Sequence, residues 1–284
     1  MFRLRDQAFT LTRDAEARFA MALGVELGAE ADEGSYSVSS REMFKGRRRL
    51  DGYHFNPTAE RALDAIRRSR KPTENLRSIV QRVFGVSRFK HVYAETGIPY
   101  LDSEDIFKIN PQIQKFIPEV TKRDADAYYV KRGWLLMACS GQLYGTNGSV
   151  ALASEWHEGK IISNHVVRVV PNAFGNAVRS GYLGMALGHP VFGRPLVLRL
   201  AFGTEVPEID PEDLSNFPVV RLGPDVEDAI ADAVEQASEL RRLANDVEDD
   251  AVALVERYVE TILAEDRAIN RAGHGSIVGK ETSL

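Results

Sequence analysis

A heptad pattern between residues 226 and 261 constrains the fold more than any other feature of the sequence. Apolar and small residues recur there with alternating spacings of four and three, as in the seam of a coiled coil. They are Val226, Ile230, Ala233, Ala237, Leu240, Ala244, Val247, Ala251, Leu254, Tyr258 and Thr261. At 1.5 Å per residue such a helix is about 55 Å long, more than one domain covers. The pattern therefore predicts a long helix that needs a helical partner.

Alanine occupies four of the eleven seam positions, which indicates a close approach between the long helix and its neighbour. The neighbour is another chain or another region of this chain, and the alternative is a helix that lies against its own domain. The residues expected to make the partner contact are Val226, Ile230, Leu240, Val247, Leu254 and Tyr258.

Charge is distributed unevenly along the chain, which bears on the kind of partner. The net charge of −5 taken alone argues mildly against nucleic acid. Residues 41–90, however, carry 14 Lys or Arg against 5 Asp or Glu, a net of +9, whereas residues 223–265 carry 3 against 13, a net of −10. The basic segment predicts a surface for phosphate groups, with an ordinary solvated face as the alternative.

Hydrophobic patterns divide the chain into four parts. We expect an N-terminal helix and linker in residues 1–40, a globular domain in 41–222, the long helix in 223–268 and a flexible tail in 269–284. The N-terminal helix is predicted from one apolar face, with Thr12 as a candidate N-cap. That face consists of Leu11, Ala15, Phe19 and Leu23.

In the globular part, short β-branched and aromatic runs alternate with turn residues, which predicts an α+β domain with a curved, mostly antiparallel sheet. Helices are expected at 58–70, which Pro72 ends, and at 173–188. The candidate strands are Ser78–Phe84, Ala127–Val130, Trp134–Ala138, Ser149–Ala153, Ile161–Val170 and Leu196–Ala201.

The sequence contains few candidates for a catalytic nucleophile, a disulfide or a metal site. Cys139 or Ser140 with His165 could form a hydrolase site, but no Gly-x-Ser-x-Gly elbow surrounds Ser140, and Cys139 is more simply the end of a buried strand. With one cysteine and no paired histidine spacing, we expect neither a disulfide nor a metal site. No segment has the pattern of a secretion signal or a membrane span, so we expect a cytoplasmic protein.

A glycine-rich loop between residues 140 and 149 presents polar side chains. Gln and Asn are the residue types that bind adenine bidentately in the major groove, and glycine lets a backbone approach a phosphate closely. The same residues also make an ordinary turn, which is the alternative. The candidates for base recognition are Gln142, Tyr144, Thr146 and Asn147.

Five segments in order along the chain resemble the specificity subunits of type I restriction-modification systems. The segment 49–57 (Arg-Leu-Asp-Gly-Tyr-His-Phe-Asn-Pro) is similar to the start of a target-recognition domain. Residues 97–106 are similar to the family's Ile-Pro…Asp-Ile segment, and residues 130–145 to its Gly-(aromatic)-Leu-Leu, Ser-Gly, Gly strand and turn. Residues 159–165 resemble the following strand, and 202–219 the exit towards a long helix.

The resemblance implies a non-catalytic subunit that binds a specific DNA duplex and positions an adenine-N6 DNA methyltransferase, with S-adenosylmethionine bound by that methyltransferase and no cofactor of its own. Family members usually carry two recognition domains and two long helices, so this chain resembles a half subunit. It would pair with itself or with a second specificity chain, and the surrounding system would methylate, restrict or serve another defence against phage. The N-terminal helix resembles one that packs beside the long helix, here on the chain's own coil or a partner's.

Within this interpretation the phosphate contacts are expected at Arg47, Arg48, Arg88 and Lys90, with Arg194 and Arg199 as weaker candidates. His165 is a further candidate for a base or phosphate contact, although a histidine satisfied within a strand is the simpler interpretation. The alternatives to a specificity subunit are a coiled-coil scaffold without base recognition and the Ser/Cys hydrolase.

Overall fold

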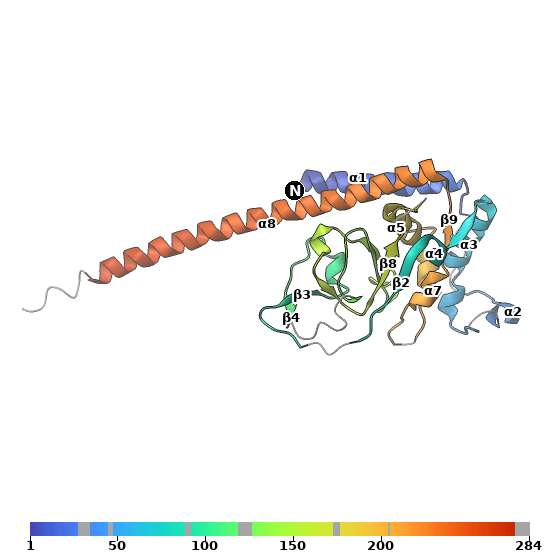
Figure 1. The fold of residues 1–284 in the computed structure, drawn as a ribbon, viewed down its shortest axis with the longest axis horizontal. Coiled ribbons are helices and arrows are strands. Elements are labelled where there is room, and N and C mark those ends of the chain that lie inside the picture. The colour runs from blue at the N-terminus through green and yellow to red at the C-terminus, as the bar shows by residue number, and fades with distance from the viewer. Residues whose placement is uncertain are drawn as a thin grey trace, which may run out of the picture.

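The computed structural model describes residues 1–27, 35–44, 48–88, 92–118, 127–172, 177–203 and 205–275. An α+β domain lies against the first half of one long helix, α8 (Pro224–Gly275), and the second half of α8 extends well beyond the domain (Figure 1). None of the described helices is long and apolar enough to cross a membrane.

Helix α1 (Phe2–Leu23) lies along the first half of α8 and runs in the opposite direction (Figure 1). Arg5 near its start bonds to Asn245 and Glu248, whereas Thr12 accepts a hydrogen bond from Arg241. The partner of the first half of the seam is therefore this chain's own N-terminal helix. The N-terminal helix was expected to pack either on this chain's long helix or on a partner's, and it packs on this chain's own.

The remaining helices are short. They are α2 (Ser40–Met43), α3 (Pro57–Ser69), α4 (Leu76–Ile79), α5 (Ser180–Gly188), α6 (Arg194–Leu198) and α7 (Pro211–Ser215), with the 3-10 turns Gly52–Phe55, Asp105–Phe107 and Glu155–His157. Asn56 caps α3 by accepting a hydrogen bond from the Thr58 backbone N–H, and Pro57 occupies its first turn, where a missing N–H costs nothing.

In the described part of the domain the strands form three small sheets. A four-stranded antiparallel sheet has the order β2 (Val80–Phe84), β8 (Val166–Pro171), β5 (Leu135–Ala138), β6 (Val150–Leu152). A three-stranded sheet joins β4 (Lys115–Ile117) and β7 (Ile161–Ile162) to β3 (Ile98–Leu101), with β3 and β7 parallel. Strands β1 (Thr73–Asn75) and β9 (Pro218–Val220) pair just before α8. The predicted α+β class with mostly antiparallel sheets is confirmed.

The main core lies between the four-stranded sheet and the helices. Met137 and Val169 of the sheet, Phe19 of α1, Leu183 of α5 and Ile230 of α8 are all buried in it. Full burial of such side chains contributes roughly 1.5–3 kcal/mol each. The first half of α8 is thus part of the core of its own chain.

Several local predictions were wrong. Leu196–Ala201 was expected to be a strand, but Arg194–Leu198 forms helix α6, with Pro195 in its first turn. Residues 127–130 contribute only an isolated bridge between Tyr129 and Ile161. Thr12 is not an N-cap, because the helix begins ten residues earlier and the Thr12 hydroxyl donates to the Ala8 carbonyl oxygen. Helix α8 also continues to Gly275, beyond the expected end at 268.

Between Val247 and Leu263 the large apolar side chains of α8 are mostly exposed. Val247, Leu254 and Tyr258 of the predicted seam are 47%, 62% and 67% exposed, whereas Ile230 is fully buried. The seam therefore has two halves, of which the first contacts this chain and the second faces solvent.

Candidate nucleic-acid interface

The loops that carry most of the candidate residues leave the four-stranded sheet at one edge. In the strand register Phe84 pairs with Arg168, Ala138 with Val166, and Met137 with Val150. Strands β2 and β5 therefore end where β6 and β8 begin. Because of this topology, the loop after β2, the β5–β6 loop and the turn before β8 all emerge together; we call this the loop edge.

The loop edge brings together Arg88, Gln142, Tyr144, Thr146 and His165, all predicted as DNA contacts. The side chain of Arg88 is 76% exposed, and Tyr144 is 89% exposed, more than any other large apolar or aromatic residue described. Gln142 and Thr146 are exposed and His165 is half-buried. Polar side chains and an aromatic ring on adjacent loops are suited to contacts with base edges and stacked bases.

Asn147 does not belong to this exposed set. It is fully buried, and its side-chain amide donates to the carbonyl oxygens of Gly141, at 2.8 Å, and Pro207, at 3.0 Å. The prediction that Asn147 reads a base is wrong for this conformation, because its donor atoms already hold the loop in place. The alternative of a structural turn applies to this residue.

Residues 202–203 and 205–208, which we call the turn 202–208, complete the loop edge, and the sequence analysis missed their place in it. Phe202 and Glu208 exchange two backbone hydrogen bonds of 2.9 and 2.8 Å, and the Gly141 N–H donates to Pro207. The Glu208 carboxylate lies 3.4 Å from the Arg88 guanidinium and 3.5 Å from the Ser140 hydroxyl. The sequence Phe-Gly-Thr-Glu-Val-Pro-Glu gives no signal that Glu208 lies beside Arg88 and Ser140, because that position depends on the fold.

The basic segment lies next to this turn. Arg47 and Lys90 lie outside the described residues, and Arg48 is exposed. The neighbouring Arg49 forms an ion pair with Asp51 and donates to the Leu200 carbonyl oxygen at 2.9 Å. Arg49 thereby attaches the segment that carries Arg48 to the chain just before the turn 202–208.

The two weaker candidates are engaged in structural contacts. Arg194 donates to the Ser149 hydroxyl and to the Gly145 carbonyl oxygen, both at 2.8 Å, and so holds the β5–β6 loop in place. Arg199 pairs with Glu60 at 2.9 Å, with its side chain 15% exposed. Both guanidinium groups are therefore held by contacts within the chain, whereas Arg48 and Arg88 are exposed.

A buried arginine shapes the turn that carries His165. Arg168 is fully buried and donates to the carbonyl oxygens of Ile162, Ser163 and Val166. Burial lowers the pKa of its guanidinium to about 10. A charged donor held by carbonyl oxygens alone makes this turn costly to rearrange. The one sequence signal for this role is a single Arg within an otherwise apolar strand.

The geometry around Cys139 and Ser140 bears on the hydrolase alternative. Burial raises the pKa of the Cys139 thiol to about 12, with the Glu208 charge as a second cause, so the thiol stays protonated near neutral pH. Ser140 contacts Glu208, and among the described residues no hydrogen bond joins its hydroxyl to the His165 ring. In the described part of the chain, no group of three or more His, Cys, Asp or Glu is placed to hold a metal ion.

Comparison with solved structures finds similarity in fold. The chain is similar to the crystal structure of the HsdS subunit from Thermoanaerobacter tengcongensis, with 16% sequence identity and a TM-score of 0.40. The match covers 88% of this chain and 52% of that one, so this chain spans about half the length of that structure. No family model and no curated protein matches the sequence.

Proposed function

We propose that this chain is a DNA specificity subunit, which binds a target duplex and positions an adenine-N6 DNA methyltransferase, without a catalytic step of its own. The observation that carries the proposal is the loop edge, where Gln142, Tyr144 and Thr146 are exposed beside Arg88. Arginines would supply phosphate contacts that fix position, and the loop side chains would contact base edges.

The segments with family resemblance support the same proposal, because the fold assembles them. Residues 97–106 and 159–165, far apart in sequence, form the adjacent parallel strands β3 and β7. Residues 130–145 provide β5 and the loop that follows it, and 202–219 provide the turn beside that loop. The resembling segments are thus parts of one domain that leads directly into α8.

The exposed half of α8 supports the proposed protein partners. Besides Val247, Ala251, Leu254 and Tyr258, a second apolar row runs beside the first, with spacings of three and four. It consists of Val252, Val255, Val259 and Ile262, which are between 46% and 61% exposed. Two adjacent apolar rows on one helix are covered by two neighbouring helices. We assign them to a second specificity half and to the methyltransferase, in a cytoplasmic complex whose S-adenosylmethionine is bound by the methyltransferase.

The test is to co-express the chain with a methyltransferase of the system and map modified adenines across a genome, with and without this chain. A two-part motif that appears only with the chain supports the proposal, and palindromic halves indicate a symmetric pair. A matched control is the variant Gln142→Ala/Tyr144→Ala/Thr146→Ala, which keeps α8 intact and should lose or change the motif. An intact complex without any chain-dependent motif would contradict the proposal.

That last result would favour a coiled-coil scaffold, for which the exposed α8 rows are the specific observation. A scaffold needs the rows on α8 but not the loop edge, so the triple variant would leave its function unchanged. The two proposals thus differ in which half of the molecule is required.

A further inference from the structure

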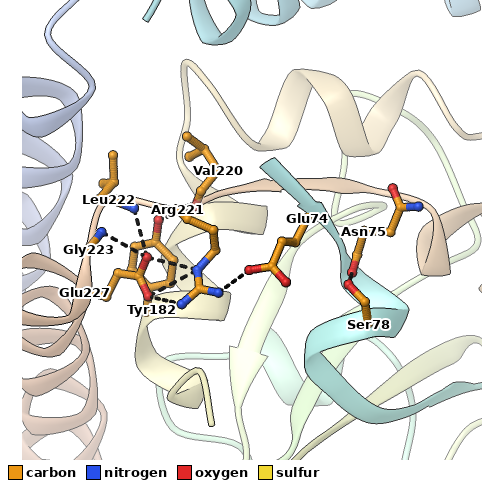
Figure 2. Close-up of polar contacts among 9 residues, drawn as sticks. All are labelled: Glu74, Asn75, Ser78, Tyr182, Val220, Arg221, Leu222, Gly223 and Glu227. Atoms are coloured by element: carbon orange, nitrogen blue, oxygen red, sulfur yellow. Dashed lines mark hydrogen bonds and ion pairs between the residues drawn. The ribbon is translucent and has the colours of Figure 1, made fainter. Parts of the chain in front are cut away.

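The turn from β9 into α8 is locked by one carboxylate. Glu227 is only 5% exposed and accepts hydrogen bonds from the backbone N–H groups of Leu222, at 2.8 Å, and Gly223, at 3.3 Å (Figure 2). Arg221 binds the same carboxylate through its Nε and Nη2 atoms, at 3.0 and 2.8 Å, and reaches Glu74 of β1 with Nη1 (Figure 2). A buried, bidentate, charge-assisted contact fixes the direction in which α8 leaves the domain.

Helix α5 strengthens this attachment at the start of α8. We call the contacts of Glu227 and Arg221, together with those between α5 and α8, the base joint. A Cβ atom added to Gly181 would lie 2.5 Å from the Ala231 carbonyl oxygen, so α5 and α8 cross with their backbones in contact. Arg179, just before α5, binds Asp232 and Glu235 of α8, both at 2.6 Å. No side chain larger than hydrogen fits at the crossing, and the two helices cannot slide without separating.

A second attachment lies about 33 Å further along α8, given 1.5 Å per residue. There the loop between β3 and β4 reaches the helix. The Asn110 amide donates to Glu248 at 2.8 Å and to Asp249 at 2.9 Å, and the Gln112 amide donates to Asp249 at 3.0 Å. We call these contacts the strap. Two attachments at separate points along a rigid helix fix the angle between the domain and α8, whereas a single attachment would let the domain pivot.

We infer that the base joint and the strap together clamp the domain to α8 at a fixed angle and thereby set the number of base pairs between the two half-sites that a paired assembly recognises. Arg221, Glu227, Asn110 and Gln112 are positioning residues in this inference, which rests on the proposed function. When two recognition domains are held by rigid helices, half-site spacing follows from the geometry of the protein. A loosened clamp would let each domain reach neighbouring registers of the duplex.

Variants of the strap are easier to interpret than variants of the base joint, because the strap residues are at the surface and their replacement leaves the core unchanged. We would label Lys131→Cys in the domain and Arg257→Cys on α8, in a Cys139→Ala background, and measure their distance distribution by pulsed electron spin resonance after dilution with unlabelled chain. The single narrow peak of the parent should be lost in Asn110→Ala/Gln112→Ala. The control Asn216→Ala/Gln236→Ala, which removes two amides elsewhere, should keep it. An unchanged distribution in the strap variant would overturn the clamp.

The spacing role is measured on the methylation map. The strap variant should modify sites whose halves are one base pair closer or further apart, in addition to the parental spacing, with both half-site sequences unchanged. Arg221→Gln should do the same and Arg221→Lys less, since lysine keeps the charge but not the bidentate contact. If the parent gives a motif and the variants keep its spacing strictly, this inference fails while the proposed function stands. If the parent gives no motif, the proposed function fails and the spacing role with it.

Discussion

The side-chain amide nitrogen of Asn147 lies 3.0 Å from the carbonyl oxygen of Pro207 and ties the β5–β6 loop to the turn 202–208. This contact joins two loops that come from distant parts of the sequence. It places the exposed Gln142, Tyr144 and Thr146 beside Glu208 and Arg88. The loop edge is therefore built on a buried amide rather than on flexible glycines.

Replacement of Asn147 by Ala should lower the free energy of unfolding by about 1–3 kcal/mol, because it removes two hydrogen bonds of a buried amide, to the carbonyl oxygens of Gly141 and Pro207. Gln142→Ala, five residues earlier and exposed, should change it by less than about 0.5 kcal/mol. Urea denaturation of both variants measures the difference. Equal stability of the two variants would show that the Asn147 contacts do not hold the loop.

The sequence was sufficient for the features that depend on local periodicity. The apolar face of the N-terminal helix contains Ala15, Phe19 and Leu23, and all three are buried. The long helix and the α+β class were also predictable, because the spacing of apolar residues along the sequence indicates both. The role of Asn147 was not, because a buried turn amide and a base-contacting amide have the same sequence signal.

The same limit applies to charges. The sequence distinguishes Arg88 from Arg194 and Arg199 only by its place in the basic segment. In the fold Arg88 alone of the three is largely exposed, since the other two are held by contacts that depend on tertiary structure. The cover of the α8 seam is a further case. Its repeat is continuous, whereas the fold buries the first half on α1 and leaves the second half exposed.

Arg88→Ala should weaken binding to every duplex to a similar degree and reduce the slope of log affinity against log salt by about one. Arg48→Ala should behave in the same way. Arg67→Ala is the control, because the Arg67 side chain is similarly exposed, at 65%, and likewise has a carboxylate partner, Asp64, but lies on α3, which is not part of the loop edge. A salt titration by fluorescence anisotropy on unrelated duplexes measures the slope. An unchanged slope for Arg88→Ala would remove this residue from the interface.

Phe19→Ala should lower the free energy of unfolding by about 3–5 kcal/mol. Phe19 is 1% exposed, and its ring lies 5.1 Å from that of His189 and 6.1 Å from that of Tyr182, so it joins α1 to α5. Phe9→Ala on the same helix is the control, since Phe9 is 64% exposed and its loss should cost less than about 0.5 kcal/mol. If Phe19→Ala were as stable as Phe9→Ala, α1 would not be part of the core.

Stability should fall as the pH falls from about 6.5 towards 4. Burial, together with the Lys160 charge, lowers the pKa of His157 to about 4, so the unfolded chain binds a proton over this range that the folded chain does not. The loss by pH 4 is about 3 kcal/mol, at about 1.4 kcal/mol per pKa unit. His157→Asn should flatten the pH dependence measured by urea denaturation, with a residual slope from His54 and His189, whose pKa values burial also lowers. A slope equal to that of the parent would contradict the prediction.

Charges placed in the exposed α8 rows should separate association from folding. In Leu254→Glu/Tyr258→Glu the altered side chains are exposed in the single chain, at 62% and 67%, so its thermal unfolding should change little. Its self-association, measured by sedimentation equilibrium, should be lost, because two carboxylates would be buried in an apolar seam.

Val255→Glu/Val259→Glu changes the second row and should weaken capture of the methyltransferase more than self-association. Glu256→Ala, which lies between the two members of each pair in sequence but on the polar face of the helix, is the matched control for both. The assignment of one partner to each row requires opposite effects of the two double variants. If both abolished self-association equally and left methyltransferase capture intact, the two rows would form one interface between copies of this chain.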